Sequence, residues 1–597
     1  MSMPSKNSPV VITGEGILCA IGLDKDSVLA SLRGKRSGIG SMRFLHSVHH
    51  ELPVGEVPLS NEEMAVRLQL EEALYVNRST LMGMLAVRQA LEDAGVDGDL
   101  LKAHPLRVVL ISGTTVAGMD VTERFFQDML TSDEHLDSLK KHSTGTSTRM
   151  IADYFGLFSE YTTISTACSS AANALLLGAR MLHDGQADLV VAGGTEALSV
   201  FHLNGFNSLM ILDHEQCRPF DATRAGLNLG EGAAYVVMEL EEQARRRRAA
   251  VHAYLRGYGN ACDAFHQTAS SDSGEGAYRA MTEALQMARL LPGDIQYVNA
   301  HGTGTPNNDL SESVALRRVF GEAMPLIGST KSYTGHTTSA SGSIEAVICL
   351  LALLHQFVPA SLGCTTPLQG GIVPTKGEEH YPLRHVVCNS FGFGGNDTSL
   401  VLSLQPAPTA SGGACGHVGP IVELARVEIT SESDLGDIRE YVKPMEARRM
   451  GKIMKSSLLS SLKALKAAGL EKPDAIITAT ARGCLENSEY LLRQIMEEGE
   501  VMLKPTYFMQ STHNTIGSNI AIWTHCHGYN VTYTQDGESL DWALRDARML
   551  LRSGKYKNVL VGLHDEATPL FQSLLERMGM AAPAAIHSIA IILSCGK

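Results

Sequence analysis

The 597-residue sequence lacks features that would mark several classes of protein. None of its 11 cysteines belongs to a C-x-x-C pair, so nothing predicts a zinc knuckle or a disulfide framework, and we expect no bound metal. We find no run of 18 apolar residues and no basic segment followed by an apolar one at the N-terminus, so neither a membrane span nor a signal peptide is predicted. These absences predict a cytoplasmic protein with reduced, mostly buried thiols.

Positive charge is also scarce. Lys and Arg number 50 against 64 Asp and Glu, and the formal net charge is −14 at pH 7. Because nucleic-acid affinity depends on contacts between Lys or Arg and phosphates, this balance argues against a general nucleic-acid binder. Hydrophobic residues make up 44% and charged residues 19%, which favours packed globular domains over long disorder.

Short β-branched segments alternate with helical ones along most of the chain. Five segments are predicted as buried strands: 10–14, 107–113, 188–194, 233–240 and 399–404. Residues 81–96 have apolar positions at helical spacing, with Gly95 as a C-cap. This alternation predicts an α/β layered fold. Residues 406–417, rich in Pro, Gly and Ala, are interpreted as a linker between a domain at 1–405 and another at 418–597.

The C-terminal segment resembles a degenerate copy of the first half of the N-terminal unit. Residues 464–480 resemble 90–114, and 534–550 align without a gap to 166–182, both ending in ARML. Residues 558–567 resemble 188–197 after a two-residue insertion. In the ungapped register Asp536 stands in the position of Cys168, and a one-residue shift puts Gln535 there. Neither residue supplies a thiolate.

The segment TTISTACSSAANALLLGARML (162–182) is the first candidate site. A strand-like run leads into Cys168, and a helix that is apolar all round follows, which indicates a buried helix. We expect the positive end of the helix dipole to lower the pKa of the Cys168 thiol and favour the nucleophilic thiolate. Taken alone, a single cysteine is more often a buried structural thiol.

Three further segments carry polar groups in loops built of small residues. His301 lies between Ala and Gly in NAHGTGTPNNDLSES (299–313), and His336 follows Lys331 by five residues in a segment that leads into a small-residue helix. The glycine-rich loop NSFGFGGND (389–397) carries Phe391 and Phe393. Each segment alone also fits a turn or helix start with a structural hydrogen bond.

Together, in this order and at these separations, the four segments resemble the β-ketoacyl-[acyl carrier protein] synthase family over about residues 8–405. The resemblance implies a thiolase-like α/β fold made of two related halves. The Cys-His-His set is that of the elongating type, since the initiating type has Asn at the position of His336. A thiolase would need a second cysteine in a C-x-G-G loop, and Cys388 has no such loop around it.

The resemblance also implies a mechanism without a cofactor beyond the phosphopantetheine of acyl carrier protein. Cys168 would take the acyl chain as a thioester, and malonyl-carrier protein would lose carbon dioxide and attack it. His301 and His336 would donate hydrogen bonds to the developing enolate, and the N–H groups of Cys168 and Phe393 would form an oxyanion hole. The remaining implied roles fall to Lys331 and Glu312 as a supporting pair, Thr303 and Thr305 at the pantetheine, Val116 in the acyl pocket, and Phe391 and Phe393 as the gating loop. Asn396 and Asp397 depart from the usual Thr-Asn after the glycines.

Residues 418–597 resemble the truncated chain-length-factor-like partners found beside aryl-polyene and flexirubin synthases. This resemblance implies a pseudo-dimer within one chain, in which the second unit shapes the acyl pocket, although a true ketosynthase dimer stays open. The alternatives are a fatty-acid-elongating synthase with a purely structural tail, a non-catalytic scaffold, and a thioesterase-like hydrolase that uses Cys168. Trp542, on the matching helix, is our sequence-based choice for a residue that alters product length.

Overall fold

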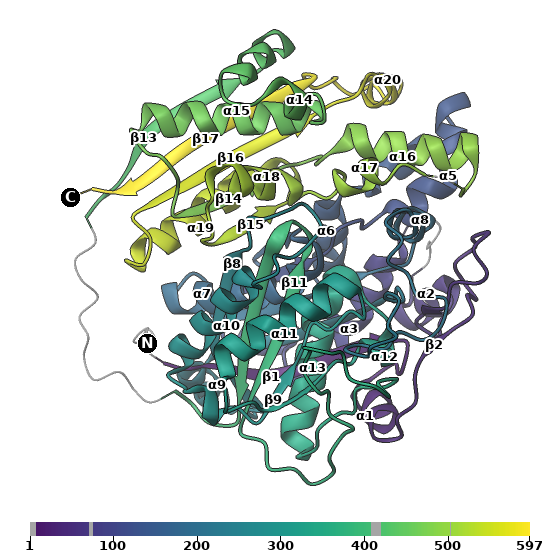
Figure 1. Ribbon diagram of the computed structural model, residues 1–597, viewed down its shortest axis with the longest axis vertical. Helices are drawn as coiled ribbons and strands as arrows, with labels where there is room; N and C mark the ends of the chain where they lie inside the picture. Colours follow the sequence, from purple (N-terminus) through teal and green to yellow (C-terminus); the bar gives the residue numbers. More distant parts are fainter. Residues whose placement is uncertain (1–7, 71–75, 408–418, 502, 597) are drawn as a thin grey trace.

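The computed structural model describes residues 8–70, 76–407, 419–501 and 503–596. Its centre is a sheet of fifteen strands in the order β10-β9-β11-β12-β8-β1-β7-β6-β4-β5-β15-β14-β16-β17-β13 (Figure 1). Residues 8–405, here the first unit, supply the strands from β10 to β5, and residues 419–596, the second unit, supply the rest. The predicted linker 406–417 falls largely on residues 408–418, outside the described ranges, so its limits remain a prediction.

The strands of the first unit are β1 (Val10–Cys19), β4 (Val108–Gly113), β5 (Glu160–Ile164), β6 (Leu189–Glu196), β7 (Gly232–Leu240), β8 (Ala253–Cys262), β9 (Tyr297–Asn299), β10 (Leu326–Gly328), β11 (His385–Gly392) and β12 (Asn396–Ser403). Those of the second unit are β13 (Ile421–Ile429), β14 (Ala475–Ala479), β15 (Asn530–Tyr533), β16 (Asn558–Glu566) and β17 (Ile586–Cys595). Two short strands, β2 (Ile39–Gly40) and β3 (Val54–Gly55), form a separate ribbon. All five predicted strands are confirmed.

The first unit consists of two related halves. In the first half β5, β4 and β6 are parallel, and β7 and β1 continue the sheet antiparallel. In the second half β10, β9 and β11 are parallel, and β12 and β8 continue it antiparallel. The halves join where β1 pairs with β8. The predicted thiolase-like fold of two α/β halves is therefore confirmed.

Two helices form the core between the halves. Helices α7 (Ser170–Asp184) and α13 (Ser341–His355) are buried along nearly their whole length and pack against each other. Among the described residues, one helical segment, Thr338–His355, is long and apolar enough to cross a membrane, and 89% of it is buried inside the protein. Its apolar character is accounted for by this position, since a helix covered on every side has no polar face.

The second unit repeats the first half of the first unit. Strands β15, β14 and β16 are parallel, and β17 and β13 continue antiparallel, which is the pattern of β5-β4-β6-β7-β1. Helices α15 (Lys452–Ala467), α18 (Thr515–Thr524) and α19 (Ser539–Arg552) take the places of α3 (Arg78–Ala94), α6 (Thr144–Phe155) and α7. The predicted degenerate copy is confirmed. Unlike α7, α19 keeps a charged face, as expected for a helix whose outer side lacks a second half to pack on.

The register of this copy differs from the one predicted by the ARML alignment. Equivalent residues are Ile164 and Tyr533, Ser170 and Ser539, and Glu196 and Asp565, all 369 positions apart and with no insertion between them. Ala167 and Asp536 share a positive φ, of 50° and 44°, at the matching turn. The residue equivalent to Cys168 is therefore Gly537, and the prediction of Asp536 or Gln535 is wrong. The two ARML segments are 368 positions apart, one fewer than the structural equivalence, so the match between them is not a match between equivalent helix positions.

The two units meet at the end of the first unit's sheet. Ile164 of β5 lies opposite Tyr533 of β15 in an antiparallel pair. Ser165 N donates to Thr532 O, and Thr534 N donates to Thr163 O, both at 3.0 Å. These contacts join residues that are equivalent in the two units, so a local two-fold relation passes through the junction and makes one continuous sheet (Figure 1).

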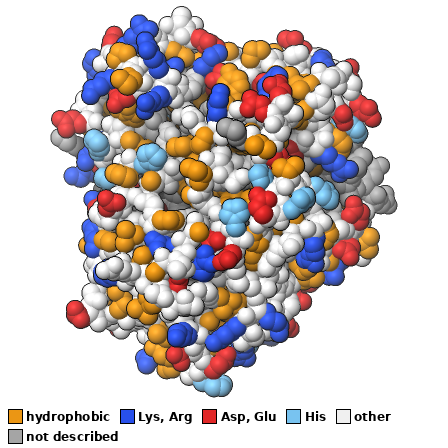
Figure 2. All heavy atoms as spheres, turned by 45° about the vertical axis from the view of Figure 1, so that its right-hand side comes forward, with side chains coloured by type: hydrophobic (Ala, Val, Ile, Leu, Met, Phe, Trp, Pro, Cys, Tyr) orange, Lys and Arg blue, Asp and Glu red, His pale blue; other side chains and the backbone are white. Residues whose placement is uncertain are grey.

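A buried ion pair also joins the units. Arg180 Nη2 lies 2.8 Å from Asp546 Oδ1, and Tyr529 donates a hydrogen bond to Asp546 Oδ2 at 2.9 Å. The Asp546 carboxylate holds the pKa of Arg180 above its usual value despite burial. Figure 2 shows that charges of both signs are interspersed on the outer face in view. The Arg180–Asp546 pair is instead buried, with side-chain exposures of 13% and 1%.

We expect Arg180→Met to destabilise the protein by about 3–5 kcal/mol, because Asp546 would remain as an uncompensated buried charge. Chemical denaturation should show a lower midpoint for the transition that includes the unit junction. The double variant Arg180→Met/Asp546→Leu should recover most of the loss, since it removes both charges. A double variant no more stable than Arg180→Met would contradict the pairing.

Candidate active site

Cys168 lies at a turn between β5 and α7. Ala167 has a φ of 50°, in the left-handed region that non-glycine residues rarely adopt, and α7 begins at Ser170. Ser170 Oγ accepts a hydrogen bond from Thr166 N at 2.8 Å and donates one to Ala167 O at 2.7 Å. These bonds hold the turn, which places the Cys168 side chain at the start of the buried helix, where the sequence predicted it.

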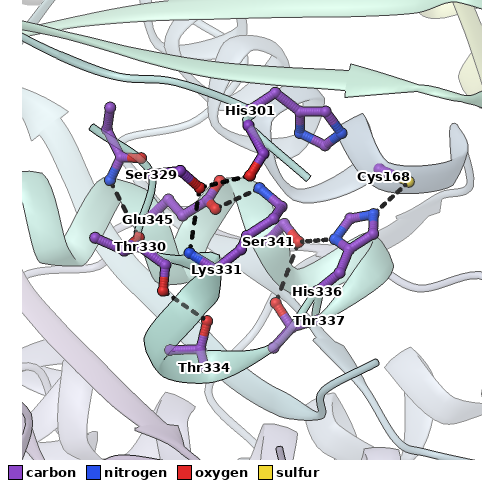
Figure 3. A network of polar contacts seen from close by, with 12 residues as sticks. Cys168, His301, Ser329, Thr330, Lys331, Thr334, His336, Thr337, Ser341 and Glu345 are labelled. Atoms are coloured by element: carbon purple, nitrogen blue, oxygen red, sulfur yellow. Dashed lines mark hydrogen bonds and ion pairs between the residues drawn. The ribbon is translucent and has the colours of Figure 1, made fainter. Parts of the chain in front are cut away.

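His336 and His301 approach this cysteine from two other loops (Figure 3). His336 Nε2 lies 3.0 Å from Cys168 Sγ, and His336 Nδ1 lies 3.0 Å from Ser341 Oγ. The ring centroids of His301 and His336 are 5.3 Å apart. Three residues separated by up to 168 positions are thus brought together, with one nitrogen of each ring within 4.8 Å of the sulfur.

Glu312 holds the loop that carries His301. Its carboxylate accepts hydrogen bonds from the backbone N–H groups of His301 and Gly302, each at 2.8 Å. Gly302 has a φ of 37°, and a Cβ there would lie 2.6 Å from the Ser329 side chain, so the tight turn needs glycine. The buried His301 Nδ1 has no hydrogen-bond partner among the described residues, which leaves a ring nitrogen for a substrate.

Lys331 does not pair with Glu312. Its Nζ lies 2.5 Å from Glu345 Oε1, and both side chains are almost completely buried. The two predicted supporting residues therefore lie at separate places, and Glu345 was not among the predicted site residues. A signal was available, because Glu345 is the one charged residue in α13, and a buried carboxylate needs a cation.

The pKa of Cys168 is opposite to our expectation. Burial raises the pKa of its thiol to about 12, and this outweighs the charge of Lys331 and the N–H groups of Phe393 and Cys168, which act to lower it. The prediction of a lowered pKa is wrong for this closed site, because desolvation disfavours the thiolate. The thiol is held neutral, 3.0 Å from an imidazole nitrogen that can accept its proton.

Both imidazoles are held neutral as well. Burial, then the positive charge of Lys331, lowers the pKa of His301 and of His336 well below the usual value. A neutral imidazole has one N–H donor and one acceptor nitrogen, so each can donate to a substrate oxygen or accept a proton. The positive charge of Lys331 thus makes protonation of both histidines less favourable.

A cavity of about 340 Å³, here the outer cavity, opens above these residues. Cys168, His301 and His336 form its floor, and Thr303, Thr305, Phe391 and Phe393 contribute to its walls. Thr303 Oγ1 and Thr305 Oγ1 lie 2.9 Å apart. The predicted pantetheine residues therefore line the same space as the predicted catalytic residues.

A second cavity of about 120 Å³, here the interface cavity, lies between the two units. Val116, Phe201 and His202 line it from the first unit. Its second-unit wall includes residues of α16 (Leu485–Glu498), α17 (Pro505–Met509) and α20 (Pro569–Arg577), among them Phe508 and Phe571. Val116, the predicted acyl-pocket residue, is in this cavity, whereas Trp542 is packed in the core and does not line it.

An aromatic cluster separates the two cavities. Phe206 of α8 (Val200–Ser208) stacks on Phe393 at 5.6 Å between ring centroids and contacts Phe508 edge-on at 5.1 Å. Phe393 lines the outer cavity, and Phe508 lines the interface cavity. The Phe206–Phe393 pair thus lies between the two spaces, and the gating role implied for the FGFGG loop stays a prediction.

The second unit reaches the gating loop directly. Asn514 Nδ2 donates a hydrogen bond to Phe393 O at 2.8 Å, and Asn396 Nδ2 donates to Asn530 O. Asn396 Oδ1 also accepts hydrogen bonds from Ser169 and Asn173 of the first unit. The departure from the usual loop sequence thus coincides with a contact to the second unit.

Two groups of side chains could geometrically hold a metal ion among the described residues. The donor atoms of Cys168, His301 and His336 lie within 4.8 Å of one another, as do those of Glu15, Asp93 and His252. In the second group, the Lys25 ammonium already pairs with Glu15 and Asp93 at 3.2 and 2.6 Å. The first group coincides with the floor of the outer cavity, where a thiol and two neutral imidazoles suit acyl chemistry.

Known proteins share these features. Residues 7–244 match the N-terminal domain of β-ketoacyl synthases, residues 252–365 match the C-terminal domain, and residues 427–597 match a second version of the N-terminal domain. The 3-oxoacyl-[acyl-carrier-protein] synthase 2 of Vibrio cholerae is 32% identical over 409 residues, covering 66% of this chain and 98% of that protein.

Solved structures agree with this similarity. The ishigamide ketosynthase/chain length factor is 29% identical, with a TM-score of 0.62 over 67% of this chain and 99% of that one. The PfaC keto synthase-chain length factor shares the fold over 98% of this chain and 78% of that chain, with a TM-score of 0.77 at 17% identity. Enzymes of this family use no cofactor beyond the carrier-bound phosphopantetheine of their substrates. The chain belongs to the β-ketoacyl synthase family and is an acyltransferase of the β-ketoacyl-[acyl carrier protein] synthase type.

Proposed function

We propose that Cys168, His301 and His336 carry out decarboxylative condensation in the outer cavity. The observation that carries this proposal is their convergence, with His336 Nε2 3.0 Å from Cys168 Sγ. Cys168 Sγ attacks the acyl thioester of a carrier protein and its proton passes to His336. His336 then gives this proton to the pantetheine sulfur, which leaves as the thiol. Malonyl-carrier protein then loses carbon dioxide, and its enolate carbon attacks the Cys168 thioester to form the β-ketoacyl chain. The Cys168 thiolate is displaced and takes a proton from water, which restores the neutral thiol.

The other residues act on charge and position. His301 and His336 donate hydrogen bonds to the malonyl thioester oxygen as the enolate forms, and the N–H groups of Cys168 and Phe393 stabilise the oxyanion of acyl transfer. Lys331 acts through the field that keeps both imidazoles neutral. Glu312 holds the His301 loop, and Thr303 and Thr305 face the pantetheine.

We propose further that the second unit acts as a chain-length factor in polyene- or polyketide-type chain assembly. Gly537, at the position equivalent to Cys168, has no side chain that could carry an acyl group. The second unit instead supplies one wall of the interface cavity, behind the Phe206–Phe393 pair. In this role it is an intramolecular pseudo-subunit, and the size of the interface cavity limits how long the chain on Cys168 grows. The similarity to the ishigamide ketosynthase/chain length factor supports this role.

Filling the interface cavity should shorten the products. Ser488, on α16, lines the cavity, and Ser488→Phe would place a ring in a space of about 120 Å³. We expect acyl loading of Cys168 with short chains to continue while the product distribution, measured by mass spectrometry, moves to shorter chains.

The matched control is Glu497→Phe, which introduces the same ring on an exposed turn of the same helix. It should leave product length unchanged. The chain-length proposal fails if Ser488→Phe, folded and able to load acyl groups, gives the wild-type product lengths.

A further inference from the structure

The interface cavity is more polar than a hydrocarbon chain requires. Alongside Val116 and Phe571, its lining includes Arg482, His142 and His513. Cavities that suit purely apolar groups are lined by apolar side chains, whereas polar walls call for a polar occupant or ordered water. The wall of this cavity therefore differs chemically from that of a pocket for a methyl-ended acyl chain.

Arg482 stands where the first unit has Val116. In the first unit, Glu196 accepts hydrogen bonds from Thr114, Thr115 and Val116, and in the second unit Asp565 accepts them from Thr480, Ala481 and Arg482. The two carboxylates are equivalent, so Val116 and Arg482 are equivalent too. Both line the interface cavity, one as an apolar side chain and the other as a cation.

Most N–H donors of the Arg482 guanidinium have no acceptor among the described residues. Its Nε donates to Glu566 O at 3.1 Å, and one Nη lies 3.7 Å from Asp565 Oδ2, beyond hydrogen-bond distance. No described residue accepts a hydrogen bond from either Nη group. Because an arginine has five N–H donors in a planar fork, most of its hydrogen-bonding capacity remains for an occupant of the cavity.

Two histidines face the same space without adding charge. His142 and His513 each precede the N-cap residue of the equivalent helices α6 and α18, and each has its Nδ1 within 3 Å of a hydroxyl, that of Thr122 or Ser165. Burial lowers the pKa of each to about 4, so both are neutral near pH 7. Arg482 is therefore the cation in this cluster.

We propose that the interface cavity receives the distal end of an acyl chain that bears an oxygen acceptor, and that Arg482 binds this oxygen, for which a carboxylate is the best match to the guanidinium fork. This rests on the proposed function, in which the chain on Cys168 extends past Phe393 into the cavity. An oxygen there would accept hydrogen bonds from the Nη groups, whereas a methyl group would displace water from them without replacing its hydrogen bonds. A volume of about 120 Å³ is close to the space that holds one benzene ring, so the distal group is small.

The test compares acyl-carrier substrates of equal chain length that end in a methyl group, a carboxylate or a hydroxyphenyl group. The rates of Cys168 acylation and condensation are measured by intact-protein mass spectrometry for the wild type, Arg482→Met and Arg482→Lys. We expect the wild type to favour an oxygen-ended chain, and Arg482→Met to reduce that preference by about tenfold or more. Arg482→Lys should retain part of the preference for carboxylate, since it keeps the charge without the fork.

The two oxygen-ended substrates separate an anionic from a hydroxyaryl ligand. Arg493→Met is the matched control, since Arg493 on α16 pairs with Glu489 outside the cavity. Thermal unfolding and acylation with the methyl-ended chain report whether each variant is folded. The inference is overturned if the wild type favours the methyl-ended chain, or if Arg482→Met discriminates as the wild type does. If Ser488→Phe still shortens products in that case, the chain-length proposal stands alone; if neither variant has an effect, both fail.

Discussion

Cys168→Ala should remove covalent acyl loading and lower the condensation rate by about 10⁴-fold or more, because the chain would lose its nucleophile. Cys168 is the thiol on the floor of the outer cavity, 3.0 Å from the His336 nitrogen that can take its proton. Incubation with acyl-carrier protein should add the mass of one acyl group to the wild type and none to the variant. Addition of malonyl-carrier protein should then release this acyl group from the wild type as a longer chain.

Cys364→Ala is the matched control for this experiment. Cys364 is more accessible than Cys168 but lines neither cavity. We expect its variant to load acyl groups as the wild type does, which would show that exposure alone does not make a cysteine reactive here. An acyl adduct that persists on Cys168→Ala would exclude Cys168 as the nucleophile and favour the scaffold interpretation of the first unit.

His301→Ala should separate the two half-reactions. The His301 ring does not contact the Cys168 sulfur as the His336 ring does, so acyl loading should continue. Condensation should fall by about 10²–10³-fold, because one donor to the developing enolate is lost. Single-turnover measurements of adduct formation and adduct release would resolve the two steps. His104→Ala, on the exposed end of α4 (Gly98–Ala103), should change neither rate.

The pH dependence follows from the neutral state of both imidazoles. Since burial and Lys331 lower the pKa of His301 and His336 well below 6.5, neither gains a proton as the pH falls from 8 to 6. The condensation rate should therefore show no decline centred near pH 6.5. The free energy of unfolding, unlike the rate, should fall as the pH falls. Unfolded histidines take up protons below about pH 6.5 whereas the buried ones stay neutral, so the stability linked to these side chains is complete above that pH and is lost below it. A rate decline near pH 6.5 that disappears in His301→Ala would contradict this assignment.

The layered fold could be predicted because its signals are local. The buried strands and the helix ending at Gly95 each carry their own periodicity or cap, and these elements form where expected. The meeting of Cys168, His301 and His336 was expected from the family resemblance, and no spacing in the sequence could have given their distances. Val116, Thr303 and Thr305, named from the same resemblance, line cavity walls, and their roles at the acyl chain and the pantetheine stay predictions.

The errors concern properties that depend on the whole fold. The pKa of Cys168 is set by desolvation, which a helix start seen in isolation does not reveal. Lys331 pairs with Glu345 across 14 positions, and only the packing of α12 (Lys331–Thr334) on α13 shows which carboxylate it reaches. The predicted register of the second unit was wrong because the ARML match lies one residue out of step with the strand pairing, which makes Gly537 the equivalent of Cys168.

The antiparallel contact between Ile164 and Tyr533 has a consequence for assembly by mass action. The outer edge of β5 is occupied by β15 of the same polypeptide, so a second copy of the protein finds no open edge there. Two separate chains that met at such an edge would come apart on dilution, whereas covalent connection keeps the local concentration of the partner in the millimolar range or above. Each translated chain thus carries its two units in a fixed one-to-one ratio, and occupancy of this junction does not depend on how much protein the cell makes.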